Sequence, residues 1–188
     1  MTKNILIVGV GGQGTLLASK LLGKALLGEG YDVKVSEVHG MSQRGGSVVT
    51  YVVYGERGGI FSPIICRGEA DIIIAFEQLE AARWLPYLKP GGVIVANTQV
   101  IAPMPVVYGD KEYPAGLIDA IKDAGVTVLP VDALARAMAA GSARSANVAL
   151  LAEAAKFMDF SPEIWEETIR ETVPPKTVEE NLRAFSAA

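Results

Sequence analysis

The chain has 188 residues, half of them apolar, and a formal net charge of −4; this length predicts a single globular domain over residues 1–188 with a sizeable core. No basic stripe is present, which argues against nucleic acid as a partner. The apolar run before Gly9 is too short for a signal peptide or a membrane span, so we expect a cytoplasmic protein without membrane contact. Cys66 is the only cysteine, which excludes an internal disulfide and any iron–sulfur or zinc site built from cysteine pairs.

In chain order, the first third predicts a buried strand, a helix and two further strands, at residues 3–9, 15–27, 31–38 and 48–55. The segment between the last two strands is rich in glycine and predicts a loop. A turn then leads into "IFSPII", residues 60–65, which we expect to form an antiparallel hairpin at the sheet edge. The apolar face of the first helix is predicted to consist of Leu16, Leu17, Leu21, Leu22 and Ala25.

The rest of the chain continues to alternate strands with helices. Strands are predicted at 70–77, 93–97 and 126–131, with a "KPGG" turn before 93. Helices are predicted from the end of the first of these strands to about Tyr87, at 114–125, and at 132–139 with Asp132 as the N-cap. From Ala146 onward the pattern is helical, with breaks near Ser161–Pro162 and Pro174–Pro175. This alternation predicts an α/β fold, a Rossmann-like three-layer α/β/α sandwich with a mainly parallel sheet, an antiparallel edge hairpin and a helical C-terminus.

A glycine loop follows the first strand directly. Gly9, Gly11 and Gly14 have the G-x-G-x-x-G spacing, between a strand and a helix. Free backbone N–H groups and the helix dipole at such a turn favour an anionic ligand or a nucleotide. Close packing of helix on strand is the alternative, and it needs no ligand. The candidate ligand-binding residues here are Gly9, Gly11, Gly12, Gln13, Gly14 and Thr15.

NAD is one possible ligand of this loop. Its ribose is held by an acidic residue at the end of the second strand, about 20 residues on, and Glu37 is close to that place. However, no second domain is available to hold a substrate against a nicotinamide. A stand-alone NAD-binding Rossmann protein therefore stays as an alternative function.

A second glycine loop, within "SEVHGMSQRGGSVVTYV", leaves the end of the second strand. Arg44 offers a planar fork of donors for phosphate or carboxylate, and adjacent glycines let the backbone approach a neighbour closely. Ligands of open α/β sheets bind at this edge; a tight turn with a solvated arginine is the alternative. His39, the only histidine, is expected to be a structural or interface hydrogen-bonding residue. The candidate ligand-binding residues here are Ser42, Gln43, Arg44, Gly45 and Gly46.

Four segments together resemble a known family: "GVGGQGTLLAS", "SEVHGMSQRGGSVVTYVVYG", "ADIIIAFEQLEAARWLPYLKPGGVIVAN" and "VPPKTVEENLRAF". They are similar to the gamma-type subunit of 2-oxoacid:ferredoxin oxidoreductases, and most of all to the small (beta) subunit of the indolepyruvate-specific enzymes. The resemblance runs nearly end to end. The "HGMSQRGG" form favours the aryl-pyruvate branch over the pyruvate, ketoisovalerate and 2-oxoglutarate branches.

The resemblance implies a subunit of an enzyme that oxidatively decarboxylates a 2-oxoacid to acyl-coenzyme A and CO2 and passes the electrons to ferredoxin. It implies thiamine diphosphate, Mg and [4Fe-4S] clusters, and these must be on a partner subunit, since one cysteine cannot hold a cluster and "GDK" at 109–111 lacks the downstream asparagines of a thiamine signature. We assign no catalytic residue and no metal ligand to this chain. Its expected roles are packing against the catalytic subunit and forming part of the surface that faces coenzyme A.

Two further expectations concern partners and alternatives. The aromatic residues Trp84, Tyr87, Trp165 and Phe185, on predicted helices of an apolar chain, suggest surfaces that are buried by self-association. An ATP-dependent activating-type protein is a further alternative, because such proteins begin with a similar strand and glycine loop. They need an acidic metal site and a cysteine nucleophile, and Cys66, in a predicted strand or hairpin, is a poor candidate.

Overall fold

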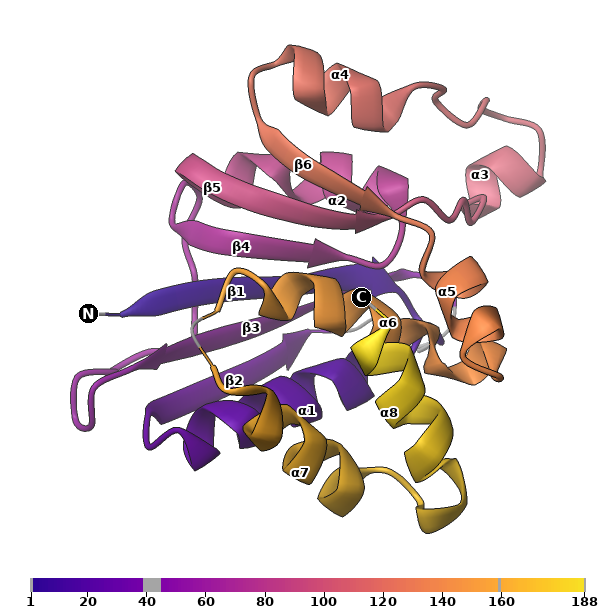
Figure 1. The fold of residues 1–188 in the computed structure, drawn as a ribbon. Helices are drawn as coiled ribbons and strands as arrows, with labels where there is room; N and C mark the ends of the chain where they lie inside the picture. The colour runs from indigo at the N-terminus through magenta and orange to yellow at the C-terminus, as the bar shows by residue number, and fades with distance from the viewer. Residues whose placement is uncertain (1, 39–44, 159, 188) are drawn as a thin grey trace.

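A six-stranded sheet forms the middle of the computed structural model, which describes residues 2–38, 45–158 and 160–187 (Figure 1). The strands are β1 (Lys3–Val10), β2 (Asp32–Val38), β3 (Ser47–Gly55), β4 (Ala70–Ala75), β5 (Leu88–Asn97) and β6 (Thr127–Val131). They lie side by side in the order β2-β3-β1-β4-β5-β6.

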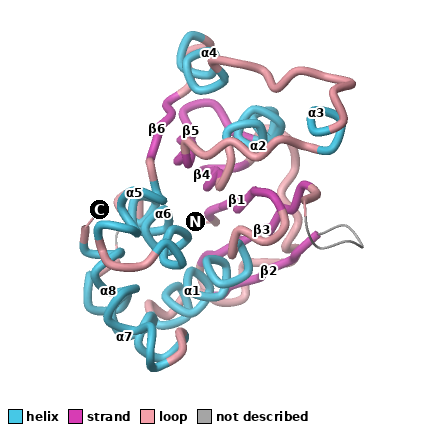
Figure 2. Tube along the Cα trace, turned by 90° about the vertical axis from the view of Figure 1, so that its right-hand side faces the viewer, coloured by secondary structure: helices cyan, strands magenta, loops and turns pink. Residues whose placement is uncertain are grey.

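Strand β3 differs from the other five in direction. It pairs antiparallel with β1 on one side and with β2 on the other, whereas β1, β4, β5 and β6 pair parallel to one another. The carboxyl ends of these parallel strands and of β2 therefore meet at one edge of the sheet, which faces the viewer in Figure 2. This edge is where an open α/β sheet binds its ligands.

Helices cover both faces of the sheet (Figures 1 and 2). The helix bounds are Thr15–Gly28 (α1), Gln78–Trp84 (α2), Met104–Val107 (α3), Leu117–Asp123 (α4), Ala133–Ala139 (α5), Ala146–Ala155 (α6), Pro162–Thr172 (α7) and Val178–Ser186 (α8), with short 3₁₀ turns at Leu85–Tyr87, Ala143–Ser145 and Pro175–Thr177. The large buried apolar residues of α1, α6, α7 and α8 belong to the core on one face, and the buried apolar residues of α2 and α4 belong to the core on the other. The predicted three-layer α/β/α sandwich is confirmed.

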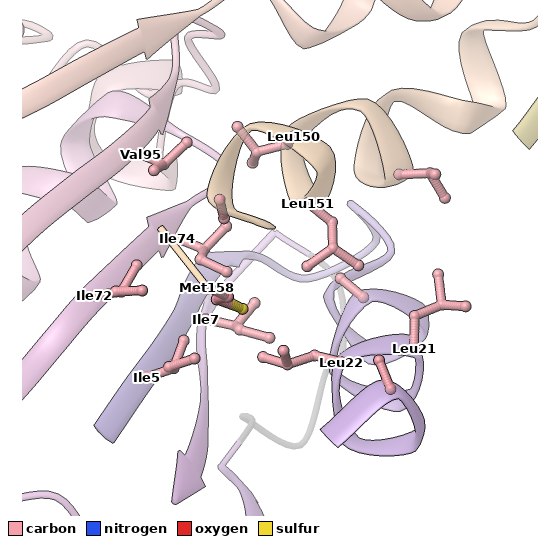
Figure 3. Packing of buried hydrophobic residues seen from close by; sticks show 14 of the residues in the cluster. Ile5, Ile7, Leu21, Leu22, Ile72, Ile74, Val95, Leu150, Leu151 and Met158 are labelled. Atoms are coloured by element: carbon pink, nitrogen blue, oxygen red, sulfur yellow. The ribbon is translucent and has the colours of Figure 1, made fainter. Parts of the chain in front are cut away.

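Alternate residues of each central strand point to the two cores. Ile5 and Ile7 face α1 and α6, while Leu6 and Val8 face α2. Strands covered on both faces need apolar side chains at every position, which explains the unbroken run "ILIV". Each such side chain stabilises the fold by about 1.5–3 kcal/mol when it is fully buried. Figure 3 shows the larger core, where Ile5, Ile7, Ile72, Ile74 and Val95 of the strands meet Leu21, Leu22, Leu150 and Leu151 of the helices.

The predicted hairpin strand at 60–65 is wrong. This segment has no strand, and the antiparallel hairpin at the sheet edge is instead β2 with β3. Pro63 has no N–H to give to a ladder. The segment is held by Ile60 and Ile65, which are buried, while Phe61 is 93% exposed. The buried side chains of Ile60 and Ile65 thus gave the sequence a strand-like pattern, although the segment pairs with no strand.

Other boundaries also shift. The "KPGG" segment is part of β5, where Gly91 has a φ of 77° and the register with β4 is irregular. Helix α4 begins only after Gly116, which adopts the left-handed conformation at its N-cap. Asp132 caps α5 as predicted, accepting from the backbone N–H of Ala135 at 2.9 Å. The predicted helix breaks near residues 161 and 174 are confirmed.

The surface expectations need two corrections. Leu16, predicted on the buried face of α1, is 63% exposed. The four aromatic residues predicted to form a partner surface pack mainly within the chain: Trp165 lies in the core against Phe185, and Trp84 packs on Tyr87. In the part of the chain that the structure describes, no helix has the length and apolarity to cross a membrane.

Candidate functional site

The two glycine loops touch at the carboxyl edge of the sheet. The N–H of Gly11 donates to the carbonyl of Gly46 at 2.9 Å, and that of Gly45 donates to the carbonyl of Gly11 at 3.3 Å. These bonds continue the β1–β3 pairing beyond its last pair, Val10 with Ser47. The candidates Ser42, Gln43 and Arg44, and also His39, lie outside the described residues.

Two glycines of the first loop are required by packing. A Cβ on Gly9 would lie 2.9 Å from the Cβ of Phe76, so β1 could not approach the end of β4 as closely. Gly14, the N-cap of α1, has a φ of 82°, and a Cβ there would lie 2.7 Å from Nδ2 of Asn147 on α6. The motif therefore has a structural role in joining β1, β4, α1 and α6, whatever the loop binds.

We expect Gly14→Ala to lower the free energy of unfolding by about 2–3 kcal/mol. A left-handed conformation costs an L-residue about 1–2 kcal/mol, and Asn147, which donates to the Gly14 carbonyl at 3.3 Å, has to move. Gly12→Ala is the control, since Gly12 also has a positive φ but a Cβ there meets nothing within 4 Å. Urea denaturation compares the two variants; equal losses would contradict a role for the α6 contact.

Gln13 is engaged by the protein itself. Its Oε1 accepts from the N–H of Val10 at 2.7 Å, and its Nε2 donates to the carbonyl of Phe76 at 2.8 Å and to Oε1 of Gln99 at 3.0 Å. The side chain therefore links the glycine loop to the segments that follow β4 and β5. Thr15 and Gly12 instead line open space beside the loop.

Two hollows lie at this edge, and both are bordered by Gly11, Gly12 and Gly14. The first, which we call the amide hollow, has a volume of about 600 Å³ and is lined also by Asn97, Gln99, Arg144 and Asn147. The second, the Glu37 hollow, has a volume of about 390 Å³ and is lined also by Glu37, Leu16 and Val38.

The charges of the two hollows differ. None of the described residues that line the amide hollow is acidic, and the guanidinium of Arg144 has no ion-pair partner among the residues that the structure describes. In the Glu37 hollow a carboxylate lies beside apolar walls. An anionic ligand is therefore favoured in the amide hollow, where the N-terminus of α1 and Arg144 both attract negative charge.

Two buried glutamates next to the site were not predicted from the sequence. Glu77, 1% exposed, caps α2 and accepts from the N–H of Glu80 at 3.0 Å, from the N–H of Ile101 at 3.2 Å and from the hydroxyl of Tyr113. Glu80, 3% exposed, accepts from the hydroxyl of Ser47 and from Nε of Arg83 at 3.0 Å. Glu77 thus holds the 98–116 segment, and Glu80 holds the start of β3. Their signal was the "FEQLE" sequence, a glutamate three residues before another at a strand-to-helix turn.

Comparison with known proteins identifies the family. Residues 4–188 match the pyruvate ferredoxin/flavodoxin oxidoreductase family. The chain belongs to this family. It is 44% identical to the indolepyruvate oxidoreductase subunit IorB of Thermococcus kodakarensis, over 97% of this chain and 92% of that protein. The expected function as a subunit of a 2-oxoacid oxidoreductase is confirmed, and the NAD-binding and ATP-activating alternatives find no support.

Solved structures confirm the fold. The gamma subunit of a keto/oxoacid ferredoxin oxidoreductase from Geobacter sulfurreducens aligns over 98% of this chain and 95% of that one, with a TM-score of 0.72 and 22% identity. The 2-oxoglutarate:ferredoxin oxidoreductase from Magnetococcus marinus, solved with 2-oxoglutarate, coenzyme A and succinyl-CoA bound, contains the same fold. The alignment covers 98% of this chain and 30% of that one, with a TM-score of 0.72 and 20% identity.

The structure also gives a physical reason against NAD in this family member. Strand β3 lies between β1 and β2, so Glu37 at the end of β2 is one strand further from the glycine loop than in a dinucleotide-binding fold. Its Oε1 also accepts from the Ser19 hydroxyl of α1 at 3.0 Å.

The residues of this chain do not fit the redox groups expected of the enzyme. Among the described residues, no three His, Cys, Asp or Glu side chains are placed to hold a metal ion. The sequence has one cysteine, Cys66, which is exposed, whereas a [4Fe-4S] cluster takes four thiolates.

Proposed function

We propose that this chain is the small, non-catalytic subunit of a cytoplasmic indolepyruvate:ferredoxin oxidoreductase. The observation that carries the proposal is the nearly end-to-end similarity to IorB, a subunit of an indolepyruvate oxidoreductase. The "HGMSQRGG" loop adds to it, because its form favours the aryl-pyruvate branch.

In the proposed complex the chemistry takes place on the partner subunit. A 2-oxoacid, coenzyme A and two oxidised ferredoxins give an acyl-coenzyme A, CO2, one proton and two reduced ferredoxins. Thiamine diphosphate with Mg would supply the carbanion chemistry and [4Fe-4S] clusters the electron path. One cysteine in this chain supports placing the clusters on the partner.

We assign coenzyme A to the edge where the glycine loops meet. The amide hollow supports this, because the lining residues that the structure describes include Arg144 but no carboxylate. Gly9, Gly11, Gly12, Gln13, Gly14 and Thr15 would form or support one wall. Ser42, Gln43 and Arg44 would provide further donors, and Gly45 and Gly46 would support the second loop beside them. The Magnetococcus marinus enzyme, which contains this fold, was solved with coenzyme A bound, which supports coenzyme A as a ligand of the proposed complex.

The purified chain alone is expected to be colourless, free of thiamine diphosphate and inactive with any 2-oxoacid and ferredoxin. It is also expected to self-associate, because Val35 and Val38 on the edge strand β2 are exposed. Absorbance, iron content, turnover and light scattering test these points. Activity should return when the chain is co-expressed with a thiamine- and cluster-bearing subunit. A brown chain with near-stoichiometric iron would overturn the proposed division between subunits, and a monomer at micromolar concentration would overturn self-association.

A further inference from the structure

Three side-chain amides meet at the carboxyl edge of the sheet. Gln13 comes from the glycine loop, Asn97 is the last residue of β5, and Gln99 follows two residues later. Nε2 of Gln13 lies 3.0 Å and Nδ2 of Asn97 lies 3.4 Å from Oε1 of Gln99. All three residues line the amide hollow.

The backbone fixes which way Gln13 and Asn97 point. An amide oxygen must face a donor and an amide nitrogen must face an acceptor. Gln13 sits between the N–H of Val10 and the carbonyl of Phe76, which allows one orientation only. Asn97 sits between the N–H of Ala133, at 3.2 Å, and the same carbonyl, at 3.1 Å, and is fixed in the same way.

The orientation of Gln99 follows from these two. Both neighbours present N–H groups to it, so its oxygen must face them and its nitrogen must point elsewhere. Among the residues that the structure describes, Nε2 of Gln99 has no acceptor. Gln99 is an exposed residue of the amide hollow, so its NH2 group is accessible to solvent and to a ligand in the hollow.

We propose that Gln99 is a ligand-binding residue whose Nε2 donates to an oxygen of the molecule held in the amide hollow. The inference rests on the proposed function, in which that molecule is coenzyme A. The acceptor is a phosphate oxygen or an amide carbonyl, since coenzyme A carries both. Gln13 and Asn97 act as positioning residues: they pre-orient the donor, which lowers the entropy lost on binding.

The test is Gln99→Glu in the assembled enzyme. A carboxylate still accepts from Gln13 and Asn97, so the network around it stays paired, but the donor becomes an acceptor. The Kd of coenzyme A should rise about tenfold to fiftyfold, because a hydrogen bond is lost and two oxygens face each other. The KM of the 2-oxoacid, whose site is proposed on the partner subunit, should not change. Gln99→Met, with neither donor nor strong acceptor, should raise the Kd about threefold to tenfold and serves if Gln99→Glu fails to assemble.

Gln78→Glu is the matched control. Nε2 of Gln78 donates to the carbonyl of Thr98 at 2.7 Å, next to Gln99, but Gln78 is not among the residues that line the hollow. It should leave the Kd unchanged. Calorimetry on the same complexes measures the binding of two fragments of coenzyme A, adenosine 3′,5′-bisphosphate and phosphopantetheine. The fragment whose affinity falls in Gln99→Glu carries the acceptor that Gln99 contacts.

The outcomes separate this inference from the proposed function. If Arg44→Ala weakens coenzyme A binding and neither Gln99 variant does, coenzyme A binds at this edge but Gln99 does not hold it. If every one of these variants binds coenzyme A with the affinity of the wild type, the placement of coenzyme A on this chain fails as well. Equal weakening by Gln78→Glu and Gln99→Glu would overturn the donor role, since it would show a general disturbance of the 98–99 backbone.

Discussion

Glu77→Ala should lower the free energy of unfolding by about 3–5 kcal/mol. Three buried or half-buried donors, the N–H groups of Glu80 and Ile101 and the hydroxyl of Tyr113, lose their shared acceptor. Each donor left unpaired costs about 1–3 kcal/mol, and water can reach some of them in the variant. Urea denaturation of the purified chain measures the change. Coenzyme A affinity of the assembled enzyme should also fall, because Ile101 lines the amide hollow.

Tyr113→Phe is the graded control, since it removes one donor and leaves the carboxylate with two. It should cost about 1–2 kcal/mol. Burial raises the pKa of Tyr113 above its ordinary value, and the hydrogen bond to Glu77 and the negative charge of Glu77 raise it further. A group whose pKa is higher in the folded chain stabilises it fully below the unfolded pKa, about 10, and loses that contribution as the pH rises. The difference between wild type and Tyr113→Phe should therefore shrink above pH 10; a constant difference would contradict the Glu77–Tyr113 contact.

Arg44→Ala should raise the KM for coenzyme A about 10- to 100-fold in the assembled enzyme. The reason is the loss of a charge-assisted contact to a phosphate, typically about 1.5–3 kcal/mol. Arg44 itself lies outside the described residues, but its neighbour Gly45 is hydrogen-bonded to Gly11 of the first loop. The KM of the 2-oxoacid and the thiamine content should stay unchanged, because neither site is expected on this chain. Steady-state kinetics on the intact complex measures the two KM values, and an assay of bound thiamine on the same preparation measures the cofactor content.

Two controls make the Arg44 result specific. Arg44→Lys should restore only part of the affinity, because a point charge cannot reproduce a two-pronged contact. Arg57→Ala removes an equal charge just beyond the other end of β3 and should have no effect. An unaltered KM for coenzyme A in Arg44→Ala would mean that the loop serves packing, and failure to co-purify with the partner would mean that it serves assembly.

The sequence predicted most of the elements because their signals are local. The 3.6 period of α1, the unbroken apolar runs of β1 and β4, and the capping Asp132 need no knowledge of distant residues. The error at 60–65 has a non-local cause: Ile60 and Ile65 are buried by other segments and not by strand pairing. The position of β3 between β1 and β2 is likewise invisible in a local pattern.

The site was predictable only in part for the same reason. The glycine spacing pointed to the edge of the sheet where the two loops meet. However, the residue that a Cβ at position 14 would clash with is Asn147, which is 133 residues away in the sequence. Gln99 and Asn97 carry no motif, and their role depends on three strand ends meeting. Polar side chains that follow strands at the carboxyl edge were the signal that could have found them.

Strand β3 also limits how this scaffold could be redesigned. Neighbouring strands lie about 4.8 Å apart, so the end of β2 stands roughly 10 Å from β1 instead of beside it. The acidic residue at that strand end holds the ribose in a dinucleotide-binding enzyme, and a change of Glu37 would act one strand too far away. Deleting β3 would remove the antiparallel partner of β1 along all eight of its residues and leave it paired with β4 alone. An engineer who wants a nicotinamide enzyme should therefore start from another backbone, because no set of point changes brings the end of β2 next to β1.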